Sequence, residues 1–428
     1  MSKHRVAFII EYIPFLHAML PAIREVSRNN ISFDVIVSPL RQDTADFTKN
    51  GRDDLLKTIE NLGFSVEDNF QKNKKYKIVY SAYHGNHEEL ARLTEIDYNV
   101  RFSYAIMVGQ KPDMIGFKYF YFYDFSICMS VPEVEFYSGY IKPRLVGNIK
   151  LANYKRSRSS PTDKKTVLYL PTWGSGGEAT TSINSATINK LVELQKKYHI
   201  ATKLHGHTVY STKQQEHHSL FSVFDKVYDV NTPVADILDD ADIVLSDLSS
   251  TAFDAIAGDV PLALFGLGEP VYYGGKLCLH QQLVKDDIIP GTNDINELES
   301  VLEKALTPEY ITKQQALKKE MFPFKGQECL DAFMQFQDDL FNDRVDPWYI
   351  ASRKFIREEY LQAQKDAVQA HEATKSAYEE VIQATKEACE AVVQSTKDAY
   401  ENSTSWKVTK PIRIISKILR RYDKQEKE

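Results

Sequence analysis

The sequence has few cysteines and no cysteine motif. Its four cysteines are widely separated in a chain of 428 residues: Cys128, Cys278, Cys329 and Cys389. They form neither a CxxC pair nor the close spacing of a disulfide framework. Because disulfides persist only in oxidising compartments, this usage predicts a protein of a reducing compartment.

Long apolar runs are also missing. No segment has the about 18 consecutive apolar residues that indicate a membrane-spanning helix. The first apolar run, VAFIIEY, is followed by Pro14; it is shorter than the core of a secretory signal peptide and has no cleavage pattern. We therefore expect a cytoplasmic protein.

Charge and motifs argue against several common functions. The formal net charge of −6 gives no general attraction to nucleic acid. No GxGxxG follows the first predicted strand, which disfavours a nicotinamide-dependent enzyme. His217 and His218 lie in a polar stretch without the carboxylate or cysteine neighbours of a metal site. We expect no metal, no cofactor and no nucleic-acid partner.

The sequence does contain apolar material for more than one core, in alternating strand and helix patterns. Apolar residues make up 43% of the chain, whose length suits two domains with an appendage. The alternation runs to about residue 150 and restarts at Thr166. We predict an α/β fold with two Rossmann-like domains, residues 1–154 and 166–345, joined by a basic linker at residues 155–165.

Residues 239–266 have the pattern of a βαβ unit. The apolar run from Ile243 predicts a buried parallel strand, residues 246–250 a polar turn, and residues 251–257 a helix. Ligands of open parallel sheets bind beyond the carboxyl ends of the strands, where helix N–H groups attract phosphate. This unit is therefore the first candidate for a phosphate site.

Two serines stand at the start of that predicted helix. Ser249 and Ser250 would add hydroxyl donors for anionic oxygens. The alternative is that they only cap the helix, with Asp254 completing a capping-box exchange. The motif alone leaves both interpretations open.

The composition changes after residue 346. Residues 373–383, 384–394 and 395–405 are three copies of an 11-residue unit. This period is close to three turns of an α-helix, so small apolar residues stay on one nearly straight stripe. We predict a helical extension over residues 346–405 that pairs with copies of itself or lies on a membrane surface; a solvated spacer is the alternative.

The last segment, residues 406–428, is basic and amphipathic. Isoleucines and leucine provide its apolar face, and its membrane-contact candidates are Trp406, Lys407, Lys410, Arg413, Lys417, Arg420 and Arg421. Such a helix is attracted to an anionic leaflet. A solubilising tail is the alternative.

Three motifs occur in order in the second domain: YLPTW at residues 169–173, KLHGH at residues 203–207 and LSDLSSTAFD at residues 245–254. Together they resemble the CDP-glycerol glycerophosphotransferase family, which includes teichoic acid polymerases and related capsule polymerases. The resemblance covers roughly residues 125–306. It implies a GT-B arrangement, a nucleotide donor held mainly by the second domain, and peripheral association with the inner face of the cell membrane.

The resemblance also implies roles for matching residues. His205 corresponds to the family histidine near the donor pyrophosphate, which makes it a catalytic candidate, and Lys203 stands where the family has arginine. Thr172 lies at the donor-side corner, and His207 either assists or is solvated. The serine loop supplies the remaining donor-binding candidates, of which the aspartates would order the loop: Asp247, Ser249, Ser250 and Asp254.

The chain departs from the family pattern on the acceptor side. Ser103 and Tyr104 occupy the place where the family has a histidine, and the only nearby His-Gly pair begins at His84. A general base must reach the acceptor hydroxyl, and the ordinary pKa of histidine suits that task. His84 is therefore the second catalytic candidate; an ordinary loop histidine is the alternative.

These observations predict a transferase of cell-surface polymer synthesis, for teichoic acid or capsule. The acceptor hydroxyl, on a lipid-linked or polymer acceptor, would attack the β-phosphorus of a CDP-alditol or the anomeric carbon of a nucleotide sugar. A third possibility is a non-catalytic membrane scaffold with a degenerate transferase domain. The expected partners are this donor and acceptor, an anionic membrane surface and further copies of the chain.

Overall fold

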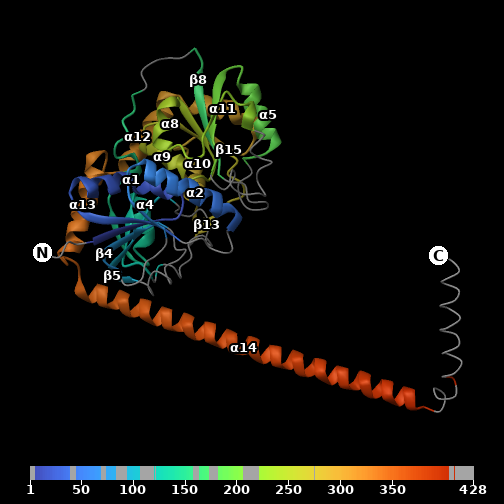
Figure 1. The fold of residues 1–428 in the computed structure, drawn as a ribbon. Coiled ribbons are helices and arrows are strands. Elements are labelled where there is room, and N and C mark those ends of the chain that lie inside the picture. Colours follow the sequence, from blue (N-terminus) through green and yellow to red (C-terminus); the bar gives the residue numbers. More distant parts are fainter. Residues whose placement is uncertain are drawn as a thin grey trace. The chain divides into compact units, whose positions relative to one another are not determined.

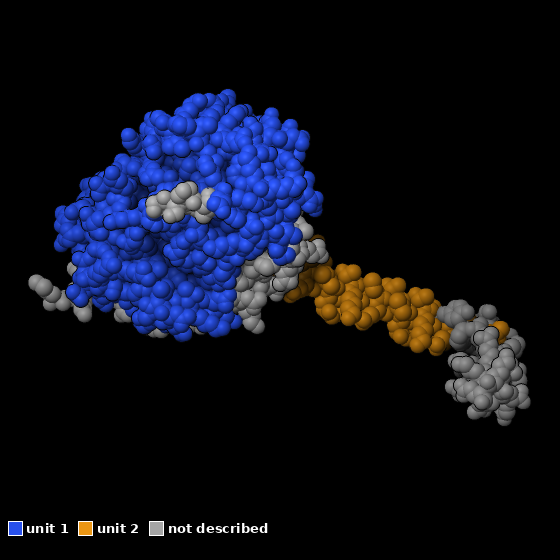
Figure 2. Space-filling model, turned by 90° about the horizontal axis from the view of Figure 1, so that it is seen from above, with its two compact units in different colours: residues 1–357 blue, residues 358–428 orange. Residues whose placement is uncertain are grey.

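The computed structural model describes residues 5–38, 45–68, 74–82, 94–106, 120, 122–157, 163–172, 182–205, 221–273, 275–403 and 409. The chain divides into two compact units, Met1–Arg357 and Glu358–Glu428, which Figure 2 shows in different colours. Unit 1 contains two parallel sheets with their helices (Figure 1).

The first sheet is formed by the N-terminal part of unit 1. Its described strands pair in the order β3-β2-β1-β4-β5-β6-β7, and every pairing is parallel. Their bounds are β1 (Arg5–Ile10), β2 (Ser32–Val37), β3 (Val66–Asp68), β4 (Lys74–Ser81), β5 (Thr94–Phe102), β6 (Phe125–Cys128) and β7 (Lys142–Leu145). The helices of this part are α1 (Ile13–Arg28), α2 (Ala45–Asn61), α4 (Val131–Tyr137) and the 3-10 turn η3 (Ile149–Leu151).

The second sheet follows with the order β10-β9-β8-β11-β12-β15, again entirely parallel. Its strands are β8 (Lys165–Leu170), β9 (Tyr198–Lys203), β10 (Lys226–Tyr228), β11 (Ile243–Ser246), β12 (Leu262–Phe265) and β15 (Gly291–Thr292). A small antiparallel pair joins β13 (Tyr272–Tyr273) to β14 (Lys276–Leu277). The helices are α5 (Ser185–Leu194), α8 (Val234–Ile237), α9 (Thr251–Ala257), α10 (Leu279–Lys285), α11 (Leu298–Ala305) and α12 (Pro308–Met321), with 3-10 turns η4 (Phe221–Val223), η5 (Leu238–Asp240) and η6 (Ile295–Glu297).

The sequence explains why β11 and β12 lie inside the sheet. Both are short runs of apolar residues whose side chains are buried on the two faces, as expected where helices cover a parallel sheet. Helix α9 between them ends at Gly258, as the pattern predicted. The predicted α/β fold with two Rossmann-like sheets is thus confirmed.

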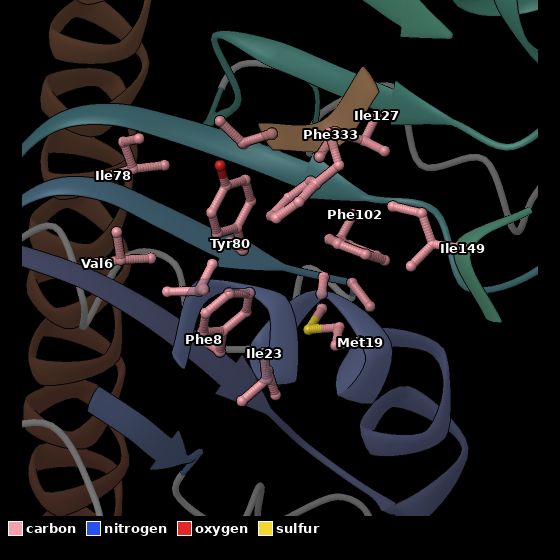
Figure 3. Close-up of a cluster of buried hydrophobic side chains, with 14 of the residues drawn as sticks. Val6, Phe8, Met19, Ile23, Ile78, Tyr80, Phe102, Ile127, Ile149 and Phe333 are labelled. Carbon is pink, nitrogen blue, oxygen red and sulfur yellow. The ribbon is translucent and has the colours of Figure 1, made fainter. Parts of the chain in front are cut away.

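Helix α13 (Gln327–Phe341) belongs to the core of the first sheet. Figure 3 shows Phe333 among side chains from the first sheet, with Tyr80 next to it. The ring centroids of Phe333 and Tyr80 are 5.3 Å apart. We expected residues 166–345 to form one donor domain, but the apolar face of α13 completes the N-terminal core instead.

Helix α14 (Pro347–Asn402) comprises 56 residues and starts within unit 1. Its first turns are bound to the segment before β6: the Tyr349 hydroxyl donates to the Asp124 carbonyl at 2.6 Å, and Arg353 Nε donates to the Tyr123 carbonyl at 3.0 Å. Arg357 forms an ion pair with the buried Asp124 carboxylate. The predicted long helical extension is therefore confirmed.

Within unit 2 the helix contains the 11-residue repeats, and its described side chains are mostly exposed. No helix among the described residues is both long and apolar enough to cross a membrane. The predicted membrane-contact residues between Trp406 and Arg421 lie outside the described part of the chain.

Candidate functional site

The strand order of the second sheet reverses between β8 and β11. Strands β9 and β10 extend the sheet on one side of β8, and β12 and β15 extend it on the other side of β11. The two central strands end level with each other, because Leu170 pairs with Ser246 and the Ser246 hydroxyl donates to the Leu170 carbonyl at 2.8 Å. The next strand along the chain lies on one side for β8, at β9, and on the other side for β11, at β12, and ligands of such folds usually bind where the order reverses in this way.

Asp247 connects the two loops at this point. Its buried carboxylate accepts hydrogen bonds from the Thr172 backbone N–H, at 3.0 Å to each oxygen, and from the Ser249 backbone N–H at 3.0 Å. The Ser182 hydroxyl donates to the same carboxylate. Burial raises the pKa of Asp247 to about 6, although these hydrogen bonds favour the ionised form. At neutral pH Asp247 is therefore a carboxylate that holds the corner after β8 to the serine loop.

The two serines differ in what their hydroxyls do. Ser249 Oγ lies 2.9 Å from Thr251 Oγ1 and accepts a long hydrogen bond of 3.4 Å from the Thr251 N–H. Ser250 is the N-cap residue of α9, but its side chain makes no capping hydrogen bond within the described chain. The Ser249 hydroxyl therefore has a partial capping role, whereas the Ser250 hydroxyl has no capping role.

His280, on α10, supports the serine loop from the protein interior, and the sequence analysis missed it. Its Nε2 lies 3.0 Å from the Ser249 carbonyl, and its ring centroid is 4.5 Å from that of Phe253. Burial lowers the pKa of His280 to about 4, so the ring is neutral at neutral pH and donates through Nε2. No sequence motif surrounds this histidine, and only its contact with the serine loop reveals it.

Asp254 has a different partner from the one expected. It accepts from Lys150 Nζ at 2.6 Å and from Asn148 Nδ2 at 3.2 Å, and both of these residues lie just after the first sheet. The capping-box exchange expected for Asp254 is therefore not formed. The reason is that its buried carboxylate faces η3, where a lysine offers stronger compensation than a backbone N–H. Through these hydrogen bonds Asp254 connects the part of unit 1 that contains the second sheet to the part that contains the first.

Lys203 is the last residue of β9, the strand that pairs with β8, and His205 lies just beyond the strand. Lys203 is half-buried, and its pKa is lowered to about 8, mainly by burial; Asp229 opposes this change, and Lys150 contributes to it. His205 is also half-buried and follows two residues later. Since β9 pairs with β8, these two side chains emerge at the same edge of the sheet as Thr172.

One histidine of the first domain reaches the same region. His17 lies on α1, directly after β1, and its pKa is lowered to about 4 by burial and by the charges of Lys203 and Lys150. The sequence analysis missed it because IPFLHAML has the pattern of an ordinary core helix. Its position one turn beyond a central strand could have indicated it.

Other predicted residues are not part of this arrangement. His84 and His207 lie outside the described residues. Ser103, at the place where the resemblance expects a histidine, is buried and donates a hydrogen bond to the buried Glu133 carboxylate. In the described part of the chain no group of three His, Cys, Asp or Glu side chains could hold a metal ion.

A family model agrees with the resemblance noted from the motifs. The model described as "CDP-Glycerol:Poly(glycerophosphate) glycerophosphotransferase" matches residues 147–325. This range contains Lys150, the end of β9 and the whole serine loop, whereas His17 lies outside it. No curated protein matches the chain.

Solved structures show the same fold at low sequence identity. A UDP-N-acetylglucosamine 2-epimerase from Listeria monocytogenes is 10% identical, with a TM-score of 0.54 over 81% of this chain and 98% of that chain. The wall teichoic acid polymerase TagF is 14% identical, with a TM-score of 0.51 over 81% of this chain and 91% of that chain. The S. aureus MnaA–UDP co-structure is 10% identical, with a TM-score of 0.51 over 79% of this chain and 97% of that chain. These matches confirm the GT-B-like fold.

The central role of Asp247 can be tested by substitution. Asp247→Ala removes the acceptor of two backbone N–H groups and should lower the free energy of unfolding by about 1–3 kcal/mol, because buried donors are left unpaired. Denaturant unfolding would measure the change. The control is Asp286→Ala, an exposed aspartate of the same domain. Equal stability of the two variants would contradict the structural role of Asp247.

Proposed function

We propose that this chain, whose residues 147–325 match the model of the CDP-glycerol:poly(glycerophosphate) glycerophosphotransferase family, transfers an alditol phosphate from a CDP-activated donor to an acceptor hydroxyl. The transferred group is glycerol phosphate or a related alditol phosphate. The product is a phosphodiester of a cell-surface polymer, teichoic acid or capsule.

The observation that carries this proposal is the serine loop at the edge of the second sheet. Asp247 and His280 hold the backbone of the loop from below, so Ser249 and Ser250 keep a fixed position. Lys203 ends a neighbouring strand and supplies positive charge at the same edge. Fixed hydroxyl donors beside a cation suit the diphosphate of a nucleotide donor.

The reaction places specific demands on these groups. The acceptor oxygen attacks the β-phosphorus of the donor, the bond from that phosphorus to the CMP oxygen breaks, and the acceptor proton passes to a base. CMP leaves with additional negative charge, which Lys203, His205 and the serine hydroxyls would stabilise. Thr172 and His207 would contact the donor from the adjacent loops. His84 remains our candidate for the base.

A nucleotide-sugar glycosyltransferase is the second candidate function. The observation that favours it is the acceptor side, where Ser103 and Glu133 form a buried hydrogen bond in place of the expected histidine. An altered acceptor side permits attack on an anomeric carbon with the same donor loop. A non-catalytic scaffold is the third candidate, and it too would explain the missing histidine.

We further propose that the enzyme works at the inner face of the cell membrane. The net positive charge and apolar residues of the segment 406–428 suit an anionic lipid surface, where a lipid-linked or polymer acceptor would be reached. Helix α14 would pair with a second copy of itself, since its repeats expose apolar side chains at equivalent positions, namely Val381, Val392, Ile382 and Val393.

Donor identity can be tested by ligand-induced stabilisation. We expect CDP-glycerol or CDP-ribitol to raise the unfolding free energy by about 2.7 kcal/mol at a hundredfold excess over Kd, and UDP- and GDP-sugars to have no effect. A thermal-shift panel would measure this. Ser249→Ala/Ser250→Ala should lose the shift, and Ser138→Ala, an exposed serine, should keep it. A response to a nucleotide sugar alone would favour glycosyl transfer, and no response would favour the scaffold.

Membrane association can be tested by truncation. Removal of residues 406–428 should abolish co-sedimentation with vesicles that contain anionic lipid, because the basic amphipathic segment is lost. The full chain should sediment with these vesicles and not with purely zwitterionic ones. If the truncated protein still sediments, the tail is not the membrane contact.

Self-association can be tested through Cys389. This cysteine lies in the second repeat and is exposed, whereas Cys128, Cys278 and Cys329 are buried. In a parallel, in-register pair of helices, equivalent cysteines lie next to each other, so a short bismaleimide should produce a covalent dimer. Cys389→Ser should abolish the dimer on a denaturing gel. A monomeric mass in light scattering, with no cross-linked product, would overturn the pairing.

A further inference from the structure

The first sheet has a ligand position of its own. Its strand order reverses between β1 and β4, as the order of the second sheet does between β8 and β11. Helix α1 begins at Ile13, three residues after the end of β1, so the first turns of α1 border this position. His17 is the histidine of those turns, and neither the family match nor the motifs include it.

Lys150 brings the two ligand positions together. Its neighbour Ile149 packs in the same core as Met19 of α1, as Figure 3 shows. Lys150 Nζ lies 3.4 Å from the carbonyl oxygen of Tyr104, at the end of β5, and 2.6 Å from Asp254 on α9. The Tyr104 ring in turn packs on Phe15, with 4.3 Å between the centroids. One ammonium group therefore lies where α1, β5 and α9 meet.

Two lysines, Lys150 and Lys203, supply positive charge around this junction. Lys150 and Lys203 both lower the pKa of His17, and Lys150 also lowers the pKa of Lys203, in agreement with the contacts that hold Lys150 against Tyr104 and Asp254. Asp254 compensates Lys150, and Asp229 partly compensates Lys203. Half-buried cations that repel one another are unfavourable for folding alone, and such an arrangement is typical of a site for an anion.

We propose that His17 contacts the diphosphate of the bound donor from the first domain, so that His17, Lys150 and Lys203 enclose this anion from both domains. The inference rests on the proposed function, because it takes a nucleoside diphosphate ester as the ligand. His17 acts as a neutral hydrogen-bond donor to a phosphoryl oxygen near the transferred group. When the donor is bound, residues of both α1 and β9 contact the same diphosphate.

The first test compares the donor affinity of matched histidine variants by titration calorimetry. His17→Gln should weaken CDP-glycerol binding about tenfold, because it removes one hydrogen bond to an anion. His199→Gln, an exposed histidine of β9, should bind as the wild type does. The denaturation midpoint of His17→Gln should match that of the wild type, which separates loss of contact from misfolding.

The second test follows the ring of His17 by NMR, with His17→Gln providing the assignment. In the free protein the His17 resonances should not titrate between pH 5 and 8, since burial and the two lysines keep the ring neutral. With CDP-glycerol bound, the pKa should rise by one unit or more, because the negative diphosphate favours the charged imidazole. A purely structural histidine would show no such shift.

The outcomes separate this inference from the proposed function. If CDP-glycerol binds the wild type and His17→Gln equally well and the His17 resonances do not respond, the inference is wrong and the proposed function stands. If only a UDP-sugar binds, the proposed function is wrong, and the same two measurements with that ligand decide the inference. Binding of none of these donors would overturn both.

Discussion

The candidate site depends on one buried carboxylate. Asp247 follows the central strand β11 and accepts backbone N–H groups from both loops that leave the sheet there, at Thr172 and Ser249. A buried charge is tolerated only where hydrogen bonds compensate it. If either loop moved, the Asp247 carboxylate would lose a hydrogen bond and the folded state would lose stability. The serine loop is thus held in one conformation by the protein's own hydrogen bonds, an arrangement that reduces the entropy a loop loses when it binds a ligand.

The junction of the two domains is built on a second charge. Asp254 turns away from its own helix terminus to pair with Lys150, and this pair is nearly buried, with side-chain exposures of 2% and 12%. Breaking a buried pair leaves an uncompensated charge, so the pair favours one placement of α9 against η3. Lys150 thereby stays beside both ligand positions, one at the edge of each sheet.

The region where the motif resemblance expects a histidine, at Ser103, is instead closed by internal polar contacts. Glu133 accepts from Ser103, from the Met129 N–H at 2.8 Å and from the Ser130 N–H at 3.2 Å, and the buried Arg101 guanidinium packs over the Tyr137 ring. The polar groups named here, at and just after the ends of β5 and β6, thus have internal partners. None of these groups is a histidine, and in the sequence His84 follows β4, the strand next to β5.

The sequence by itself determined the two parallel sheets, the βαβ unit around the serine loop and the long helix, because these follow from local periodicity and contiguous motifs. Only the tertiary structure decided that α13 packs on the first sheet, that Asp254 pairs with Lys150, that His280 holds the carbonyl of Ser249, and that the charges of Lys203 and Lys150 lower the pKa of His17. The physical reason is the same in each case: these interactions join residues far apart in the chain, and they depend on burial and charge in the folded protein, which no local sequence pattern records.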